Sequence, residues 1–451
     1  MVSKRTEELL RWDREHIVHS KWGIGGNCGI SIDKSYGIYF QDTEGKEYID
    51  ASSQLVCVNL GYGQQEIIDA VREEMDKLQY AMHFYGFTNE PSIRCGQKLS
   101  KVVPRGLDHF DFTAGGSESI DVAIRLARLY WSVKGRSKYK IISLYDSYHG
   151  VGGPGLAVNG SGRGFFERAG APLMSGSMHI PSFYCYRCMF GLEYPSCDIR
   201  CAKFLAEVIE KEGAENIAAF IAEPEIGAGG MIAPPGEYWP IIRRICDKYD
   251  VLLIDDEVMT GFGRTGKMFA IEHWNVKPDI MTMAKGITSA YLPFGAVAFN
   301  DEIWNTLQGS NFITFTYSGH PVCATAAVKA LEIYERDKVV DNAARVGKYA
   351  LEQFKAILGP LPCVGEISGL GLMIGIEIVA DKATKRPFDP KLKIMQQLHE
   401  RALEKGMFLR VSDISSTPSD RACFCPPLVI TAEEVERIID ILYPIVVSLK
   451  G

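Results

Sequence analysis

Lys285 stands in a nearly uncharged part of the sequence. Of the 21 residues between Asp279 and Asp301, it is the only one with an ionisable side chain apart from Tyr291. An amine in so apolar a segment loses hydration, which lowers its pKa and makes it a better nucleophile toward carbonyl groups. Such a lysine can form a Schiff base. An isolated lysine, by contrast, is usually a surface residue whose charge reaches water, so further chemical signals are needed to decide.

A second segment could bind phosphate. The strand-like run FDF leads into Gly115, Gly116 and Ser117, and an amphipathic helix follows. Glycines let the backbone approach an anion closely, Ser117 can donate its hydroxyl, and a helix N-terminus adds free N–H groups and a favourable dipole. The alternative is a Gly-Gly turn capped by Ser117, with Glu118 and Asp121 in the first helical turn.

Three consecutive carboxylates, Asp255, Asp256 and Glu257, follow the apolar run VLLI. A carboxylate at the end of a buried strand is costly without a cationic or proton-donating partner, so at least one of them should meet a specific group. The alternative is a set of solvated acids. Together, phosphate-binding segment, strand-end aspartate and desolvated lysine are what pyridoxal phosphate requires: an anchor, a carboxylate that keeps the ring nitrogen protonated, and an amine that carries the aldehyde as an imine.

The middle of the chain alternates short apolar runs with amphipathic stretches, which predicts a mostly parallel sheet covered by helices. We expect strands at residues 140–144, 217–222, 251–255, 279–284 and 295–299. A helix is expected over residues 237–249, with one apolar stripe and charges opposite. Open α/β sheets bind ligands at strand ends, which is where the three chemical features fall.

Other elements flank this sheet on both sides in the sequence. Residues 37–50 are typical of a hairpin that turns at Glu44-Gly45, and a helix is expected over residues 66–78. From about Ala324 the chain should be helical to Arg345 or later. The later expected strands are GLMIGIEIV (371–379), MFLRV (407–411) and CFCPPLVI (423–430), and the later expected helices span about 391–405 and 432–449. This tail predicts a small α/β domain joined by a long helix.

The composition narrows the class of protein. Of 451 residues, 46% are hydrophobic and 23% charged, which is average for soluble globular proteins and excludes disorder, collagen-like repeats and a small disulfide scaffold. The net charge of -7 opposes attraction to nucleic acid or to an anionic membrane. Twelve cysteines are too few for a disulfide framework, and the charged N-terminus does not resemble a signal peptide. We therefore expect a cytoplasmic protein whose partners are small molecules or another chain.

The motifs GGSES, YHG, AEP, DDEVMTGFGRTG, MAKG, PFGAV and TYSGHP occur in this order. Together they resemble the class III (ω-amino acid) aminotransferases of pyridoxal-phosphate fold type I, and the resemblance covers about Asp33 to Leu449. It implies an α/β fold with a mostly parallel central sheet covered by helices. The implied organisation is an N-terminal segment (1–65) that packs with the small domain, a large cofactor-binding domain (66–330) and a C-terminal small α/β domain (331–451).

The resemblance also implies roles for individual residues. Lys285 would carry the cofactor and shuttle a proton to and from the substrate, and Asp256 would pair with the pyridine nitrogen. The other implied cofactor contacts are Val258 and Tyr148 on the two ring faces, with His149 beside Tyr148, Gly116 and Ser117 at the phosphate, and Glu223 near the ring hydroxyl. Thr316 would reach the phosphate of the neighbouring subunit, so the resemblance implies a homodimer with shared active sites.

Three positions bear on the substrate. Arg410 resembles the family arginine that binds a substrate carboxylate, for which its planar fork is suited, whereas the alternative is a surface arginine at a strand end. Ala228 stands where ornithine- and γ-aminobutyrate-type members carry a glutamate that neutralises an arginine, which favours pyruvate over 2-oxoglutarate as acceptor. Val56 stands where amine:pyruvate members carry a bulky tryptophan, so we expect a wider pocket that admits a longer or branched amine.

One segment has no counterpart in the family pattern. Cys185, Cys188, Cys197 and Cys201 have C-x2-C-x8-C-x3-C spacing, which is near that of a structural zinc or iron–sulfur site. The alternative, and the favoured interpretation from sequence, is four unpaired thiols near the active-site entrance with no metal.

These features predict a pyridoxal-phosphate-dependent transaminase. It would move an amino group from an ω- or β-amino acid, its thioester or an amine to a 2-oxo acid, with pyruvate as the expected acceptor. The same scaffold hosts other chemistry, so 2-oxoglutarate as acceptor, or a decarboxylase, aminomutase or phospho-lyase, are the alternatives. A further alternative is a non-catalytic protein that binds the cofactor or an amine.

Overall fold

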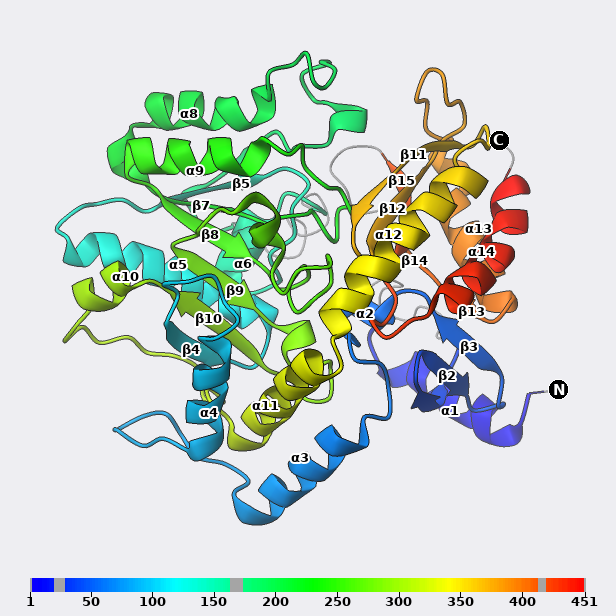
Figure 1. The fold of residues 1–451 in the computed structure, drawn as a ribbon, viewed down its shortest axis with the longest axis horizontal. Coiled ribbons are helices and arrows are strands. Elements are labelled where there is room, and N and C mark those ends of the chain that lie inside the picture. The colour runs from blue at the N-terminus through cyan, green and yellow to red at the C-terminus, as the bar shows by residue number, and fades with distance from the viewer. Residues whose placement is uncertain (1, 20–28, 163–172, 413–418, 450–451) are drawn as a thin grey trace.

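The computed structural model describes residues 2–19, 29–162, 173–412 and 419–449. Its largest element is a seven-stranded sheet in the order β4-β10-β9-β8-β7-β5-β6, with smaller sheets beside it (Figure 1). The strands are β4 (His109–Thr113), β5 (Lys140–Leu144), β6 (Ser177–Ile180), β7 (Ile217–Ala222), β8 (Leu252–Asp256), β9 (Ile280–Met283) and β10 (Gly295–Phe299). Strands β5 to β9 run parallel, and β10 is antiparallel to both of its neighbours. The expected mostly parallel sheet is therefore confirmed.

The apolar runs of the sequence give these strands nearly the expected bounds. Strands β5, β7 and β10 have the predicted ends, and β8 and β9 differ from prediction by one residue at each end. Every residue of β7, β8, β9 and β10 is buried. Such strands need uninterrupted apolar runs because helices cover both faces of the sheet.

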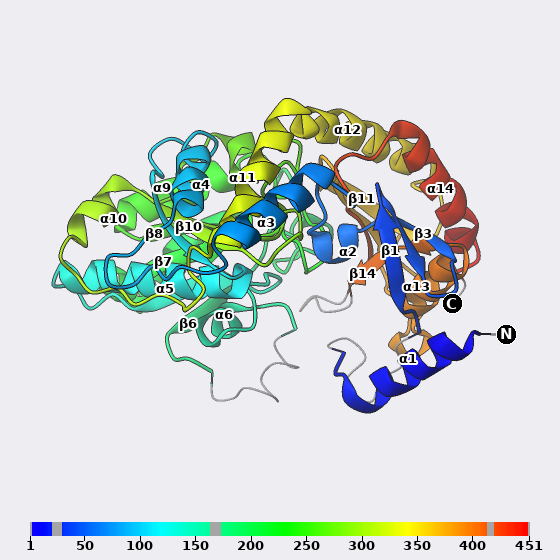
Figure 2. The same cartoon turned by 90° about the horizontal axis from the view of Figure 1, so that it is seen from below.

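Helices cover the two faces of the large sheet (Figures 1 and 2). One face packs on α5 (Gly116–Val133) through residues such as Ile254, and the other packs on α9 (Tyr238–Tyr249) through residues such as Leu253. Neighbouring side chains of a strand point to opposite faces, so β8 serves both layers. The other helices of this region are α3 (Gln65–Lys77), α4 (Glu90–Leu99), α6 (Gly153–Val158), α8 (Arg200–Glu212) and α10 (Asp301–Thr306).

Two smaller sheets lie at the other end of the molecule. One has the order β1-β2-β3-β13 and the other the order β11-β12-β15-β14. The strands are β1 (Ile32–Tyr36), β2 (Tyr39–Asp42), β3 (Glu47–Asp50), β11 (Val364–Leu370), β12 (Met373–Ile378), β13 (Met407–Phe408), β14 (Arg410–Ser412) and β15 (Asp420–Phe424). Strand β13 pairs with β3 of the N-terminal hairpin, so the two ends of the sequence share a sheet. The expected domain boundaries stay predictions.

The remaining helices are α1 (Lys4–His16), α2 (Ser53–Val56), α11 (Pro321–Arg336), α12 (Val339–Ile357), α13 (Ile394–Glu404) and α14 (Ala432–Val447). The expected long helix from about Ala324 is two helices, α11 and α12, which follow one another from the large sheet to the smaller ones (Figure 2). They are separated at Lys338, whose φ of 51° is left-handed and cannot continue a right-handed helix.

Two strands of the tail differ from expectation. The run CFCPPLVI does not form a strand of its own, because β15 begins earlier and ends at Phe424, before Pro426 and Pro427, which lack the N–H that a ladder needs. The run MFLRV is divided into β13 and β14, which belong to different sheets. Strand β11 was not predicted.

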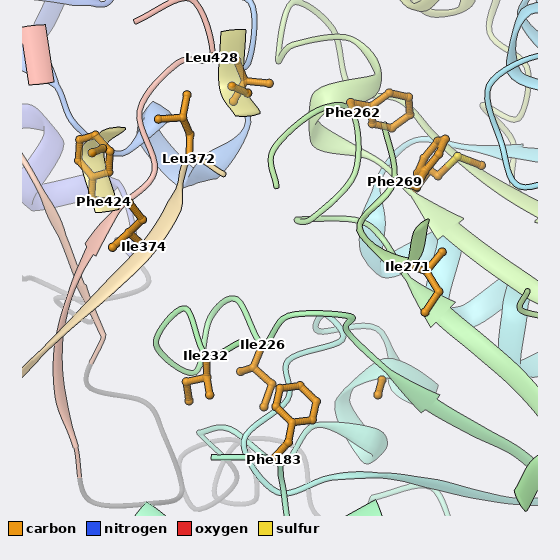
Figure 3. Packing of buried hydrophobic residues seen from close by; sticks show 14 of the residues in the cluster. Phe183, Ile226, Ile232, Phe262, Phe269, Ile271, Leu372, Ile374, Phe424 and Leu428 are labelled. Atoms are coloured by element: carbon orange, nitrogen blue, oxygen red, sulfur yellow. The ribbon is translucent and has the colours of Figure 1, made fainter. Parts of the chain in front are cut away.

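A single large hydrophobic cluster connects the two ends of the molecule. Figure 3 shows Ile374 and Phe424 from the small sheet together with Phe262, Phe269 and Ile271 from the segment between β8 and β9, all members of this cluster. The continuous packing fixes the two regions relative to each other. Within the described part of the chain, no helix is both long enough and apolar enough to cross a membrane.

Candidate active site

A cavity of about 380 Å³ opens at the carboxyl ends of the large sheet's strands. Its walls come from the segments that follow β4, β5, β7, β8 and β9. The predicted site residues among them are Gly116, Ser117, Tyr148, Glu223, Asp256, Val258 and Lys285. The volume suits a small cofactor with its substrate. The structure thus brings together the three chemical features that the sequence places at strand ends.

Lys285 directly follows β9, at the start of the 3-10 turn η4 (Lys285–Ile287). Its φ of 46° is left-handed, an uncommon conformation for a residue with a side chain. Burial lowers the pKa of this amine, while the negative charges of Asp256 and Glu223 oppose the shift. Lys285 is therefore a partly desolvated amine within the electrostatic reach of two carboxylates, as its apolar segment predicts.

Asp256, the last residue of β8, forms a buried pair with His149. Its Oδ2 lies 2.7 Å from His149 Nδ1, while Oδ1 accepts hydrogen bonds from the Val258 N–H at 3.0 Å and the Thr282 hydroxyl at 3.1 Å. The other ring nitrogen of His149, Nε2, is buried and has no hydrogen-bond partner among the described residues. The sequence predicted His149 only as a neighbour of Tyr148, because nothing in the YHG motif alone indicates a partner 107 residues away.

The two acids beside Asp256 lie away from the cavity lining. Asp255 is fully buried, and neither of its carboxylate oxygens has a hydrogen-bond partner among the described residues. Burial and the charge of Glu257 raise the pKa of Asp255 well above its usual range. Glu257 accepts from the Ile271 N–H at 2.8 Å and from Thr260, and burial raises its pKa to about 8. Both shifts favour the protonated, neutral acids. Of the three acids, only Asp256 lines the cavity.

Glu223 follows β7 and is buried at the cavity wall. Its Oε1 accepts from the Tyr148 N–H at 2.9 Å, and its Oε2 accepts from the Gly227 N–H at 2.8 Å. Burial raises the pKa of this carboxyl to about 7, although the His149 ring opposes the shift. A group with such a pKa can hold or release a proton near neutral pH.

The glycine-serine segment forms a cradle at the start of α5. This helix begins at Gly116, and its first turn has no side-chain cap, so Ser117 does not act as one. Instead, the Ser117 hydroxyl oxygen accepts from the Val151 N–H at 3.1 Å. A Cβ atom on Gly116 would lie 2.7 Å from Cγ1 of Val258, which leaves no room for a side chain. An uncapped helix N-terminus at a cavity favours an anion such as phosphate.

Two predicted substrate residues, Arg410 and Ala228, lie beside the cavity and not in its lining. Arg410 Nη2 donates to the Ala228 carbonyl at 3.2 Å, and Arg410 Nη1 is buried without a hydrogen-bond partner among the described residues. The positive charge of Arg410 lowers the pKa values of both Lys285 and Tyr148, although burial raises that of Tyr148 overall. Arg410 is therefore close enough to meet a ligand bound in the cavity.

Val56, which was expected to shape the substrate pocket, does not line the cavity. It is 1% exposed and belongs to a small cluster rich in sulfur, which also contains Met231, Met259, Met373, Cys423 and Cys425. The cavity lining includes Met259 and not Val56. A residue at position 56 would therefore reach the cavity through Met259.

Thr316 is exposed and does not line the cavity of its own chain. Its carbonyl accepts a hydrogen bond from the Tyr80 hydroxyl at 2.8 Å, which holds the segment against the region before α4.

Sequence reasoning missed several apolar residues of the lining. They follow η4 and are Thr288, Ala290, Leu292, Pro293 and Phe294. Phe294 stacks on Phe112 of β4 with 5.3 Å between ring centroids. The signal was present in the sequence, because these residues belong to the uncharged stretch around Lys285.

The profile of the class III aminotransferases matches residues 25–446. The chain belongs to this family. It is 35% identical over 447 residues to a diaminobutyrate–2-oxoglutarate transaminase of Halomonas elongata, covering 96% of this chain and 94% of that protein. It is 36% identical over 412 residues to a putrescine–pyruvate aminotransferase of Pseudomonas aeruginosa, covering 90% and 88%.

Solved structures agree with the family assignment. A transaminase from the marine bacterium Virgibacillus superposes with a TM-score of 0.92 at 37% identity, covering 97% of this chain and 98% of that one. An amine transaminase from an uncultivated Pseudomonas species, solved in a PLP-bound form, has a TM-score of 0.89 at 32% identity, covering 97% and 98%. The chain is thus a pyridoxal-phosphate-dependent aminotransferase.

The side chains of the cavity fit this cofactor. The cradle at Gly116 excludes any side chain, the Asp256 carboxylate is held by three donors, and Lys285 is a desolvated amine. The phosphate, the ring nitrogen and the aldehyde of the cofactor would each meet a group of matching chemistry.

Proposed function

We propose that this aminotransferase moves an amino group from an ω- or β-amino acid, its thioester or an amine to pyruvate. The observation that carries the proposal is the convergence of Lys285, Asp256 and Glu223 on one cavity, with Arg410 beside it. The relatives support the donor class, because diaminobutyrate and putrescine in their names both carry an amino group at the end of a chain. The bound cofactor supplies the electron withdrawal that makes the donor's C–H acidic.

Each residue would have a separate task. Lys285 would hold the cofactor and move the proton at the amine-bearing carbon, since burial lowers its pKa and so favours the neutral amine that acts as a base. Asp256 keeps the ring nitrogen protonated, and His149 is a positioning residue that holds Asp256. Gly116 and Ser117 bind the phosphate at the start of α5, while Tyr148 and Val258 enclose the ring.

Arg410 supports a substrate with one carboxylate near the cavity. No carboxylate pairs with its guanidinium within the described ranges, and its buried Nη1 has no hydrogen-bond partner there. Pyruvate has one carboxylate and 2-oxoglutarate has two, so the larger acid needs a second cation. Among the described lining residues, Lys285 is the only lysine or arginine. This difference favours pyruvate as the acceptor.

The deciding experiment is a panel of amino donors, tested with pyruvate and with 2-oxoglutarate. Equal amounts of alanine and the donor's carbonyl product support the proposal. Release of ammonia, carbon dioxide or phosphate would instead indicate one of the related reactions of this scaffold. Lys285→Ala should abolish turnover and the imine absorbance of the bound cofactor, whereas the matched exposed-lysine variant Lys267→Ala should change neither. Full activity of Lys285→Ala would contradict the assignment.

We further propose a cytoplasmic homodimer in which Thr316 serves the neighbouring active site. Thr316 is exposed, and the segments around it expose large apolar side chains, including Tyr85, Phe87, Ile313 and Tyr317. The rings of Tyr80 and Tyr317 are in contact, so these two segments form one apolar surface. Such a surface is typical of a subunit interface.

Subunit mixing tests the shared site. Lys285→Ala and Thr316→Ala chains should each be weakly active or inactive alone. A mixed dimer contains one site with both residues intact, so random mixing should recover about a quarter of the wild-type sites. If mixing recovers no activity although mixed dimers form, Thr316 does not serve the other subunit.

A further inference from the structure

Four cysteines surround one small cavity away from the active site. Cys185 begins the 3-10 turn η1 (Cys185–Arg187) and Cys188 follows it, while Cys201 lies in the first turn of α8 and Cys197 three residues before that helix. All four are half-buried, none forms a disulfide, and all line a space of about 20 Å³. We call these residues the thiol cluster. The aminotransferase chemistry proposed above uses none of them.

Mostly apolar residues share the walls of this space with the cysteines. Phe183, Tyr184, Leu192, Ile199 and Pro235 line it together with the cysteines. A space of about 20 Å³ holds roughly one water molecule or one ion. It has no room for a cluster of several iron and sulfide ions, so only the single-ion alternative of the sequence analysis fits its size.

The thiols are close enough to affect one another's ionisation. Burial is the main reason that the pKa of Cys185 rises to about 11 and that of Cys201 to about 12, and the other cysteines of the cluster add to both shifts. What bears on a shared ligand is the position of the four sulfurs around one space, and not their ionisation.

We propose that the thiol cluster binds one Zn²⁺ ion through Cys185, Cys188, Cys197 and Cys201. Two short ligand pairs, C-x2-C and C-x3-C, are typical of structural zinc sites, and four sulfur ligands complete a tetrahedron. Binding releases the four thiol protons to solvent and forms four Zn–S bonds. The ligands are all sulfur, which selects zinc over harder cations such as Mg²⁺ or Ca²⁺.

Binding must draw the sulfurs together. In the described part of the chain, no group of three or more His, Cys, Asp or Glu side chains is already spaced to hold a metal ion. Zn–S bonds of about 2.3 Å put the sulfurs roughly 3.8 Å apart in a tetrahedron. The connecting segment can adjust, because Met189, Leu192 and Tyr194 are all more than two-fifths exposed, and Gly191 forms a turn with a φ of 65°.

The zinc site would hold a segment that contacts the substrate side of the active site. Tyr184 and Arg187, which flank Cys185, both donate to the buried Glu377. Arg421 donates to the Tyr184 hydroxyl at 3.0 Å and to the Gly230 carbonyl at 2.6 Å. Gly230 lies two residues from Ala228, whose carbonyl accepts from Arg410. The effect on substrate binding rests on the proposed function, whereas zinc binding itself does not.

Metal content of the purified holoenzyme is the direct test. We expect about one zinc per chain by mass spectrometry of the dissolved protein, and its loss in the double variant Cys197→Ser/Cys201→Ser. The matched control is Cys323→Ser, a half-buried cysteine outside the cluster, which should keep the zinc. Cobalt exchanged into the wild-type protein should show the intense visible absorption of tetrahedral thiolate coordination. This spectrum does not depend on whether the double variant folds.

The outcomes separate zinc from its alternatives. Four free thiols with no zinc, and no cobalt spectrum after addition of the metal, would overturn the proposal. Disulfides found by peptide mapping, or iron with sulfide, would overturn it too. Neither measurement requires turnover, so a protein that binds zinc but does not transaminate would contradict the proposed function alone. If both hold, the double variant should raise KM for the 2-oxo acid more than it lowers kcat.

Discussion

Gly116→Ala tests whether the cradle at the start of α5 has room only for glycine. The added Cβ would lie 2.7 Å from Cγ1 of Val258, whereas carbon atoms in contact are about 3.5–4.0 Å apart. Val258 must therefore move by roughly 1 Å, and it lines the cofactor cavity. Overpacking of this kind costs about 1–3 kcal/mol. If that cost falls on cofactor binding, the Kd of pyridoxal phosphate should rise about 5- to 150-fold.

The assay is an equilibrium titration of the apoenzyme with pyridoxal phosphate. The matched control is Gly236→Ala, because Gly236 is exposed, does not line the cavity, and no atom lies within 4 Å of its added Cβ. It should bind the cofactor as the wild type does. Combining Gly116→Ala with Val258→Ala should cost much less than the sum of the two single changes, since the smaller side chain removes the clash. Additive effects, or a Gly116→Ala protein that binds normally, would refute the reasoning.

Three further predictions concern buried polar groups. His149→Leu removes a hydrogen-bond donor to Asp256. Because a hydrogen bond to a charged group contributes about 1.5–3 kcal/mol, kcat/KM should fall roughly 10- to 150-fold. An unchanged kcat/KM would show that Asp256 does not need His149. Folding raises the pKa of Glu223 from 4.5 to about 7, so the folded state binds its proton more tightly and stability falls as pH rises through this window. Glu223→Gln should reduce this pH-dependent loss of unfolding free energy by about 3 kcal/mol, as measured by urea unfolding of the apoprotein at several pH values. If the unfolding free energy of the variant depends on pH as it does in the wild type, the prediction is wrong. Arg421→Met leaves the buried Glu377 with fewer partners and should destabilise the protein by about 3–5 kcal/mol, measured as a lower Tm; an unchanged Tm would mean that Arg187 suffices.

The strands of the large sheet could be predicted because each is a short apolar run. Burial on both faces requires such runs, and their ends are marked by charged residues or glycines. The direction of β10 could not be predicted, since the run GAVAF reads the same in a parallel or an antiparallel strand. The segment between Lys285 and β10 is too short for the helical crossover that a parallel strand needs, and this length was the one available signal.

Val56 shows where residue patterns are insufficient. It lies in α2, where Ser53, Gln54 and Val56 all have positive φ values. The spacing of a regular helix does not predict side-chain directions in such a backbone, in which Leu55 is 70% exposed and Val56 is 1% exposed. The family resemblance concerns only the place of position 56 along the chain, whereas the direction of its side chain depends on conformations that branched residues rarely adopt. Only the structure shows that Val56 packs with methionine and cysteine side chains.

The register of the parallel strands explains why three distant residues form one site. Ala222 of β7 lies opposite Asp255 of β8, so Glu223 comes level with Asp256. Asp256 in turn lies opposite Thr282 of β9, and Lys285 follows three residues later, just beyond the end of that strand. Glu223, Asp256 and Lys285 therefore leave adjacent strands at the same edge of the sheet. A shift of one residue between any two strands would turn one of these side chains toward the opposite helix layer. The apolar runs that fix this register are thus as necessary for the chemistry as the polar residues that end them.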